Sequence, residues 1–176
     1  MGRKLTSYNG EDNIMTPKEM AKAIVESIKP SGVILEPCKG EGSFTEVFEE
    51  MGLEYEWCEI QEGRDFFDKS ETDANWVITN PPFSKVRKFI MKSVELGIPN
   101  IALLVTVNTI WMNGKLNFLK ENGYQLQEIN LIESPYFRRM GNWRQSGFSL
   151  GVLVIRKNSP GNFPINNTLK VGEIFW

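Results

Sequence analysis

The chain has 176 residues, of which 41% are hydrophobic and 24% are charged, and its formal net charge is -2. This length and composition are typical of a single globular domain, residues 1–176, with a full hydrophobic core. The weakly acidic net charge argues against extensive nonspecific binding to DNA. No apolar run reaches the length of a membrane span, and residues 1–4 lead into no apolar signal-peptide region, so we expect no membrane association.

The histidine and cysteine content limits the kinds of catalytic and metal sites that the chain can form. The chain has no histidine, which excludes histidine-based triads and the usual zinc centres, and no metal site is expected. Its two cysteines, Cys38 and Cys58, stand near the ends of predicted strands and neither staple loops nor form a metal site. Cysteines used in this way favour a reducing compartment, and we expect a cytoplasmic protein.

The first predicted elements are a helix and a strand that runs into a glycine turn. The N-terminal segment, residues 1–30, contains Met15-Thr16-Pro17 and then a helical run from Lys18 to Ile28. Val33 to Leu35 reads as a short buried strand, and Phe44 to Met51 reads as the next helix. A strand, a glycine turn and a helix form the nucleotide-binding unit of doubly wound folds.

The glycine turn itself is Glu36-Pro37-Cys38-Lys39-Gly40-Glu41-Gly42. Gly40 and Gly42 permit a tight bend and the close approach of a ligand to the backbone. The spacing is not that of the dinucleotide fingerprint Gly-x-Gly-x-x-Gly. Glu36 at the strand end suits a ligand that carries an ammonium group or hydroxyls better than a phosphate.

The next two strands also end in polar side chains. Leu53 to Glu59 reads as a strand whose last residue could accept both hydroxyls of a ribose, the alternative being a solvated strand end. Gly63 to Phe67 follows, and then the apolar strand Trp76 to Thr79, which ends at Asn80. In an open α/β sheet, ligands bind outside the carboxyl ends of the strands, so these side chains should border one cleft.

The corner Asn80-Pro81-Pro82-Phe83 is the most specific pattern in the chain. Two prolines remove two backbone donors and hold the preceding residues extended. The corner therefore offers oxygen acceptors beside the flat ring of Phe83, which suits a planar amino group with two hydrogens. The alternative is a Pro-Pro turn that merely ends a strand.

The remaining elements complete an α/β order. Lys85 to Leu96 reads as a helix, Ile101 to Val107 as a central buried strand, and Leu116 to Glu121 as part of a helix that begins near Gly114. Leu126 to Glu133 and Phe148 to Ile155 should form an antiparallel hairpin. In the C-terminal tail, residues 158–176, Asn158 to Asn167 reads as a loop, and Leu169 to Trp176 as either an edge strand or a cover for the core. We thus expect a Rossmann-like, doubly wound, mostly parallel sheet with a C-terminal antiparallel hairpin.

Two loops are candidate substrate contacts. The loop from 134 to 147 carries Arg138, Arg139 and Arg144 among aromatic residues and no acid. Guanidinium groups suit phosphates and aromatic rings suit unstacked bases, although the arginines could instead stack on the loop's own rings. Trp111, in the loop after the central strand, is either a core cap or a wall of the substrate pocket.

Taken together, these motifs resemble those of the class I S-adenosylmethionine-dependent amino-methyltransferases, especially the N6-adenine DNA methyltransferases. The glycine turn resembles their cofactor motif, Asn80-Pro81-Pro82-Phe83 their catalytic motif, and Met15-Thr16-Pro17 the motif that touches the methionine end of the cofactor. The motif order resembles the gamma arrangement. The resemblance implies S-adenosyl-L-methionine as cofactor, with cofactor-binding residues Thr16, Glu36, Pro37, Cys38, Gly40, Gly42, Glu59, Asp65, Phe66 and Asn80.

The resemblance also implies a nucleic-acid substrate, most readily DNA methylated at adenine N6. Phe83, Trp111, Arg138, Arg139 and Arg144 are then the candidate substrate-binding residues. No segment is long enough to form a separate target-recognition domain, which leaves two alternatives open. One is an RNA base amino-methyltransferase, and the other is a noncatalytic cofactor-binding module that pairs with a recognition subunit.

Overall fold

The computed structural model of the chain describes residues 15–107, 109, 113–133, 150–159 and 165–170. Its strands, in chain order, are β1 (Ile34–Glu36), β2 (Tyr55–Trp57), β3 (Trp76–Thr79), β4 (Asn100–Thr106), β5 (Tyr124–Glu133), β6 (Leu150–Lys157) and β7 (Ile165–Lys170). The helices are α1 (Lys18–Ile28), α2 (Ser43–Glu50), α3 (Val86–Glu95) and α4 (Asn113–Glu121), with short 3₁₀ helices η1 (Ile60–Glu62), η2 (Phe66–Asp68) and η3 (Phe83–Lys85).

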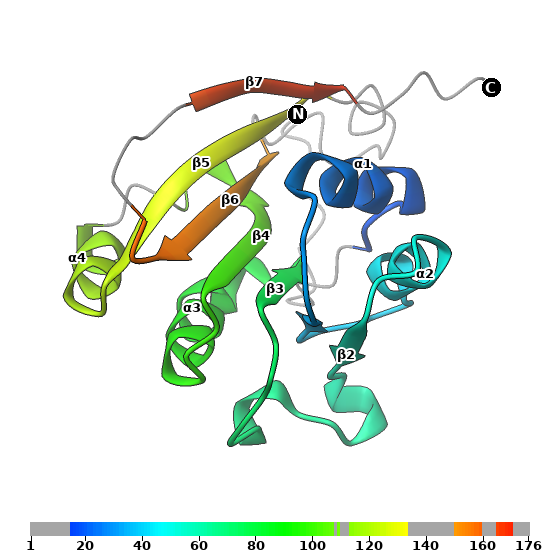
Figure 1. The fold of residues 1–176 in the computed structure, drawn as a ribbon, viewed down its shortest axis with the longest axis horizontal. Coiled ribbons are helices and arrows are strands. Elements are labelled where there is room, and N and C mark those ends of the chain that lie inside the picture. The colour runs from blue at the N-terminus through cyan, green and yellow to red at the C-terminus, as the bar shows by residue number, and fades with distance from the viewer. Residues whose placement is uncertain (1–14, 108, 110–112, 134–149, 160–164, 171–176) are drawn as a thin grey trace, which may run out of the picture.

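The strands form one seven-stranded sheet in the order β2-β1-β3-β4-β6-β5-β7 (Figure 1). Within the described sheet, β6 alone runs against its neighbours, pairing antiparallel with β4 and with β5. The pairs among β2, β1, β3 and β4 are all parallel, and so is the pair of β5 with β7. This arrangement confirms the expected Rossmann-like, mostly parallel sheet and its antiparallel hairpin.

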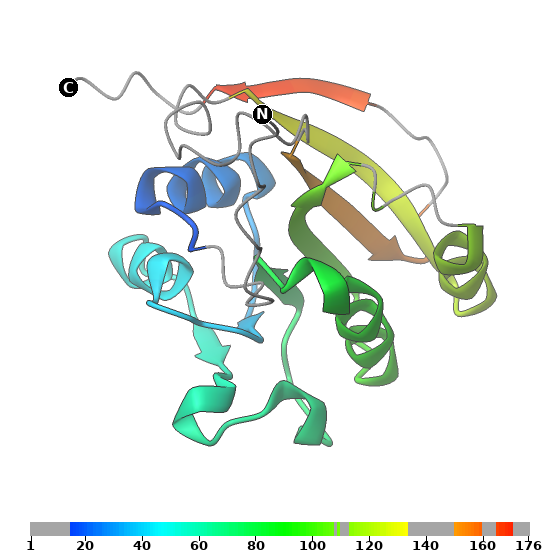
Figure 2. The same ribbon diagram turned by 180° about the vertical axis from the view of Figure 1, so that it is seen from behind.

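Helices cover the two faces of the sheet, as Figures 1 and 2 show from opposite sides. The side chains of α1 and α2 pack with one set of strand residues, which includes Ile78 and Ala102. Those of α3 and α4 pack with the alternate set, which includes Val77 and Ile101. Successive strand residues point to opposite faces, so both faces of the central strands are apolar, as their continuous hydrophobic runs predict.

The position of β1 creates the crevice in which a ligand would bind. β1 lies between β2 and β3. The chain passes from β1 through α2, on one face, to β2, and from β3 through α3, on the opposite face, to β4. The segments that follow β1 and β3 therefore diverge, and the space between them at the carboxyl ends of the strands is the usual ligand crevice of such sheets.

Several sequence-based boundaries differ from those of the structure, and two of them concern the site and the edge of the sheet. The second strand is confined to Tyr55–Trp57, two residues short of Glu59. The predicted loop 158–167 overlaps a strand, because β7 begins at Ile165 and adds to the edge of the sheet beside β5. An edge strand is held by backbone hydrogen bonds, which polar residues such as Asn166 form as readily as apolar ones. Leu169 and Lys170, the described residues of the segment from 169 to 176, lie in β7.

Among the described residues, no helix is long and apolar enough to cross a membrane. Nor do the described acidic and cysteine side chains gather into a group that could hold a metal ion.

Candidate active site

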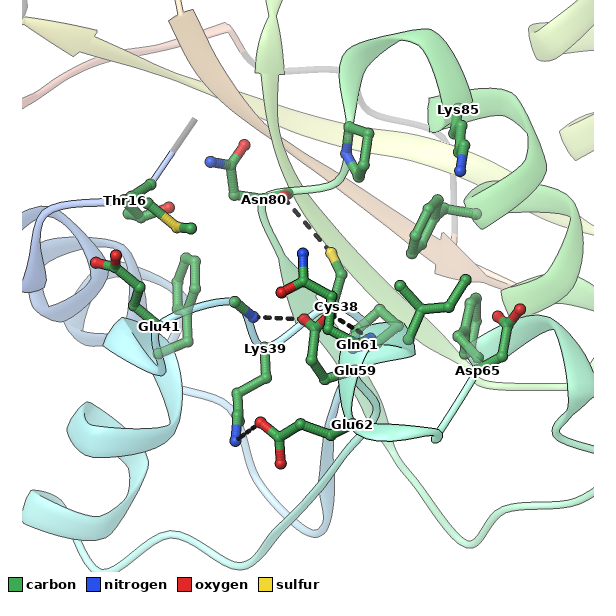
Figure 3. Close-up of a pocket in the computed structure, with 18 of the residues that line it drawn as sticks. Thr16, Cys38, Lys39, Glu41, Glu59, Gln61, Glu62, Asp65, Asn80 and Lys85 are labelled. Atoms are coloured by element: carbon green, nitrogen blue, oxygen red, sulfur yellow. Dashed lines mark hydrogen bonds and ion pairs between the residues drawn. The ribbon is translucent and has the colours of Figure 1, made fainter. Parts of the chain in front are cut away.

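A cavity of about 360 Å³ lies at the carboxyl ends of β1, β2 and β3, within the size range of small-molecule sites (Figure 3). Residues from three chain segments, each following one of these strands, line it together with residues just before α1 and Phe89 of α3. Its described lining comprises Met15, Thr16, Pro37, Cys38, Lys39, Gly40, Glu41, Ser43, Phe44, Glu59, Ile60, Gln61, Glu62, Asp65, Phe66, Phe67, Asn80, Pro82, Lys85 and Phe89.

The glycine turn forms one wall of this cavity. Gly40 and Gly42 both have positive φ, at 54° and 95°, a conformation that side-chain-bearing residues rarely adopt. A Cβ on Gly42 would also lie 3.1 Å from Thr45 Oγ1, whose hydroxyl donates to the Gly42 carbonyl across 2.9 Å. The turn thus bends sharply into α2 and leaves backbone beside the cavity.

Glu59 ties the glycine turn to the segment after β2. Its Oε2 accepts a hydrogen bond from the Gly40 backbone N–H at 2.8 Å, and its Oε1 accepts one from Gln61 N–H at 3.1 Å. A carboxylate has about four lone-pair positions, so each oxygen can still accept a bond from a ligand in the cavity. Figure 3 shows the side chain among the lining residues.

Glu36 lies beneath the cavity rather than on its lining. It is 1% exposed, and its Oε1 accepts from Cys38 N–H at 3.0 Å. Burial raises the pKa of Glu36 to about 8, and the charge of Glu59 adds to the rise, while hydrogen bonds from Thr79 and Cys38 oppose it. The sequence placed Glu36 at the strand end but gave no sign that the chain would cover it. Direct contact between Glu36 and a ligand is therefore not supported by its position.

Cys38 joins the glycine turn to the Asn80 corner. Its Sγ lies 2.9 Å from Thr79 Oγ1 and 3.5 Å from the Asn80 carbonyl oxygen. Burial and the neighbouring Glu36 raise the pKa of this thiol well above its usual value, so it stays protonated and can serve as a hydrogen-bond donor. Cys38 and Cys58 are both free thiols.

Aromatic rings form a second wall. Asp65 Oδ1 accepts a hydrogen bond from Phe67 N–H at 2.9 Å. This bond caps η2, which begins with Phe66 and Phe67. Phe66 stacks on Phe89 with ring centroids 5.4 Å apart, and Phe67 meets Phe89 edge-on at 5.1 Å. Rings held in this way present a rigid apolar surface beside the Asp65 carboxylate.

Some residues of the Asn80 corner line the cavity and others pack in the core. Asn80 and Pro82 line the cavity, whereas Pro81 is buried. Phe83 is outside the lining and packs, partly buried, against the core on the α1 and α2 face of the sheet. The position of Phe83 therefore does not support it as a substrate-binding residue in this cavity.

The structure thus brings Thr16, Pro37, Cys38, Gly40, Glu59, Asp65, Phe66, Asn80 and Pro82 to one cavity. Three predicted site residues lie outside the lining: Gly42 in the glycine turn, Glu36 beneath the cavity and Pro81 in the Asn80 corner. Trp111, Arg138, Arg139 and Arg144 lie outside the described residues.

Several lining residues were not predicted from the sequence. Lys39 pairs with Glu62 of η1 at 2.5 Å, and both Lys39 and Arg64 lie 4.0 Å from the centre of the Trp57 ring. Lys85 and Phe89 reach the cavity from the segment after Asn80. A signal for Lys85 existed, because the chain from 74 to 94 carries four cationic residues and no acid.

Comparison with known proteins gives a fold but no family. No protein-family model matches the chain, and no curated protein matches it. Among solved structures it is similar to the "putative RNA methyltransferase PH1948 from Pyrococcus horikoshii", with a TM-score of 0.51 and 15% identity over 78% of this chain and 81% of the other. It is also similar to the "plantazolicin methyltransferase BpumL in complex with SAH", with a TM-score of 0.50 and 11% identity over 81% and 82% of the two chains. The chain therefore has the Rossmann-like fold of these methyltransferases.

Proposed function

We propose that the protein transfers a methyl group from S-adenosyl-L-methionine to an exocyclic amino group of a nucleic-acid base, with adenine N6 in DNA as the first candidate. The observation that carries this proposal is that Asn80 and the glycine turn line the same cavity. A corner that suits a planar amino group thereby faces the turn that resembles a cofactor motif.

The chemistry of the cavity fits the cofactor. Four acidic residues, Glu41, Glu59, Glu62 and Asp65, line it, and S-adenosyl-L-methionine carries a net positive charge at neutral pH. Glu59 can accept bonds from the ribose hydroxyls, and the rings of Phe66 and Phe89 can lie against the adenine. One of the two similar structures is a complex with SAH, the demethylated form of this cofactor.

The chain's own residues supply orientation rather than acid–base groups. When bound, the cofactor would supply a methyl group activated by its sulfonium sulfur, which would leave as a neutral thioether. The Asn80 side-chain oxygen, on a residue that lines the cavity, would accept an amino hydrogen and so direct the nitrogen lone pair at the methyl carbon. After transfer, the nitrogen releases one proton to water. Positioning of this kind can lower a barrier by about 7–11 kcal/mol, which suits a site without histidine.

Two observations bear on the substrate. The Thr16-Pro17 segment and the motif order resemble DNA methyltransferases, whereas one similar structure is described as an RNA methyltransferase. RNA is accordingly the second candidate. The presence of Asn80 in the cavity disfavours a purely noncatalytic subunit, for which an amino-group corner has no use.

The test offers cofactor labelled with tritium in its methyl group to DNA, total RNA and cell protein in parallel. We expect label in nucleic acid, recovered as N6-methyladenine after digestion to nucleosides. Label found only in protein, or at a ring carbon, would contradict the proposal.

A further inference from the structure

The segment that follows the Asn80 corner is strongly basic. Between Asp73 and Glu95 the chain has Lys85, Arg87 and Lys88 near the start of α3, then Lys92, and no acid. The whole chain, by contrast, has a net charge of -2. This stretch therefore carries a local excess of positive charge on a weakly acidic molecule.

These cations lie where a helix disfavours them. Lys85 precedes the first residue of α3, and the first turn of the helix contains no acidic residue. The N-terminal end of a helix carries partial positive charge, so cations there are unfavourable unless an anion is bound. Within the described part of the chain, Lys85, Arg87 and Lys88 form no ion pair, whereas Lys92, farther along, pairs with Glu95 at 2.8 Å.

The basic segment borders the cavity on the side away from the glycine turn. Lys85 and Phe89 both line the cavity, and the exposed Arg87 and Lys88 lie between them in sequence, within about one helical turn. Figure 3 shows Lys85 on the segment that follows Asn80. The cofactor carries a net positive charge and a single carboxylate, which could pair with Lys85 at most and leaves the charge of the exposed Arg87 and Lys88 unaccounted for.

We propose that Lys85, Arg87 and Lys88 form a docking surface for the phosphates of a nucleic-acid strand whose target base enters at Asn80. This inference rests on the proposed function and adds to it a recognition surface formed by the start of α3. A base in the cavity would leave its sugar and the flanking phosphates outside it, and Arg87 and Lys88 are exposed within one helical turn of Lys85, which lines the cavity. Guanidinium and ammonium groups bind phosphate without reading sequence, so the surface positions the strand and leaves specificity to other contacts.

The test compares the double variant Arg87→Gln/Lys88→Gln with a matched control, Lys22→Gln/Lys120→Gln. The control residues are exposed on α1 and α4 and lie outside the cavity. Binding of a single-stranded oligonucleotide is measured over a range of salt concentrations, with methylation kinetics and cofactor calorimetry alongside. We expect the first variant alone to raise the KM for the oligonucleotide severalfold and to reduce the log–log salt slope by about 0.7 for each phosphate interaction that the substitutions remove. Its cofactor affinity should equal that of the wild type.

The possible outcomes separate the two proposals. If the wild type methylates the oligonucleotide and the Arg87→Gln/Lys88→Gln variant keeps the same KM and salt slope, the docking surface is refuted and the proposed function stands. If the variant lowers the salt slope but the wild type methylates no nucleic acid, the proposed function is refuted and the docking surface stands. A polyglutamate peptide that binds the wild type as tightly as the oligonucleotide would also overturn the docking surface.

Discussion

At the scale of single residues, the site contains two carboxylates, Glu36 and Glu59, that were both predicted to end a strand but have different environments. Glu59 lies on the cavity with both oxygens bonded to backbone N–H groups. Glu36 is buried beneath it with a pKa of about 8. Two acids that looked equivalent as strand-end residues therefore differ in position, since Glu59 faces the cavity and Glu36 is buried below the glycine turn.

The raised pKa of Glu36 predicts a pH-dependent stability. Between about pH 4.5 and pH 8 the folded chain keeps a proton on Glu36 that the unfolded chain has released, so raising the pH favours unfolding. This group should lower the free energy of unfolding by up to about 1.4 kcal/mol per pH unit over that interval. Urea unfolding at several pH values checks this, with Glu36→Gln expected to remove the slope and exposed Glu54→Gln to retain it. Equal slopes in Glu36→Gln and the wild type would show that Glu36 is already ionised in the fold.

We expect Glu59 to contribute to the affinity for S-adenosyl-L-methionine. Glu59→Ala removes the acceptor proposed for the ribose hydroxyls and frees the Gly40 and Gln61 N–H groups. Hydrogen bonds to a charged group are worth about 1.5–3 kcal/mol, so the Kd for S-adenosyl-L-methionine should rise about 10- to 150-fold in calorimetry. Glu54→Ala, an exposed acid just before the same strand, is the control and should bind like the wild type. A Glu59→Ala protein with unchanged Kd would remove Glu59 from the site.

At the scale of elements, the start of the sheet is fixed by one asparagine. Asn75 Oδ1 accepts from Val33 N–H at 2.9 Å, Asn75 N–H donates to the Val33 carbonyl at 2.7 Å, and the Asn75 carbonyl accepts from Asn100 Nδ2 at 2.9 Å. These bonds join the beginnings of β1, β3 and β4. They hold in register the strands whose other ends form the cavity.

Gly32 is the residue that lets Asn75 approach. Its φ is +79°, and a Cβ there would lie 2.0 Å from Asn75 Oδ1. We expect Gly32→Ala to lower the free energy of unfolding by about 2–4 kcal/mol, since it adds a broken hydrogen bond to the strain of a left-handed alanine. Gly52→Ala is the matched control, because its φ is +64° and nothing lies within 4 Å of the added Cβ. It should cost only about 1–2 kcal/mol. Equal losses in the two variants would mean that the Asn75 contact contributes nothing.

Features that a residue determines through its own backbone could be predicted from the sequence, whereas features that depend on packing between distant segments could not. The glycine turn and the Asn80 corner were predictable, since glycine and proline restrict the backbone by themselves. The direction of Phe83 and the burial of Glu36 were not, because each depends on helices that pack over the sheet from distant parts of the chain. An edge strand was one of two alternatives for Leu169 to Trp176, but the start of β7 at Ile165 was not predicted, because its pairing with β5 relies on backbone groups and leaves little trace in residue type.

At the scale of the whole molecule, acidic and basic residues lie on different sides of one cavity. Four acidic residues line the cavity on the side of the glycine turn and of η1, where Lys39 is paired with Glu62, and Lys85 lines it on the side of α3. This division fits a cationic cofactor on one side and a polyanionic substrate on the other. The net charge of -2 hides it, because the net charge sums all 20 cationic and 22 acidic residues of the chain.

Catalysis by the Asn80 corner is tested most sharply by single-turnover methyl transfer in the wild type, Asn80→Asp and Asn80→Ala, with the methylated nucleoside identified by mass spectrometry. We expect methylation of an exocyclic amino group by the wild type and a rate lower by about 10²–10³ in Asn80→Ala, the loss typical of one oriented hydrogen-bonding group. Cofactor binding should survive in both variants, and Asn80→Asp, which keeps an acceptor oxygen, should retain part of the rate. An Asn80→Ala protein that methylates at the wild-type rate would show that this corner does not orient the amino group.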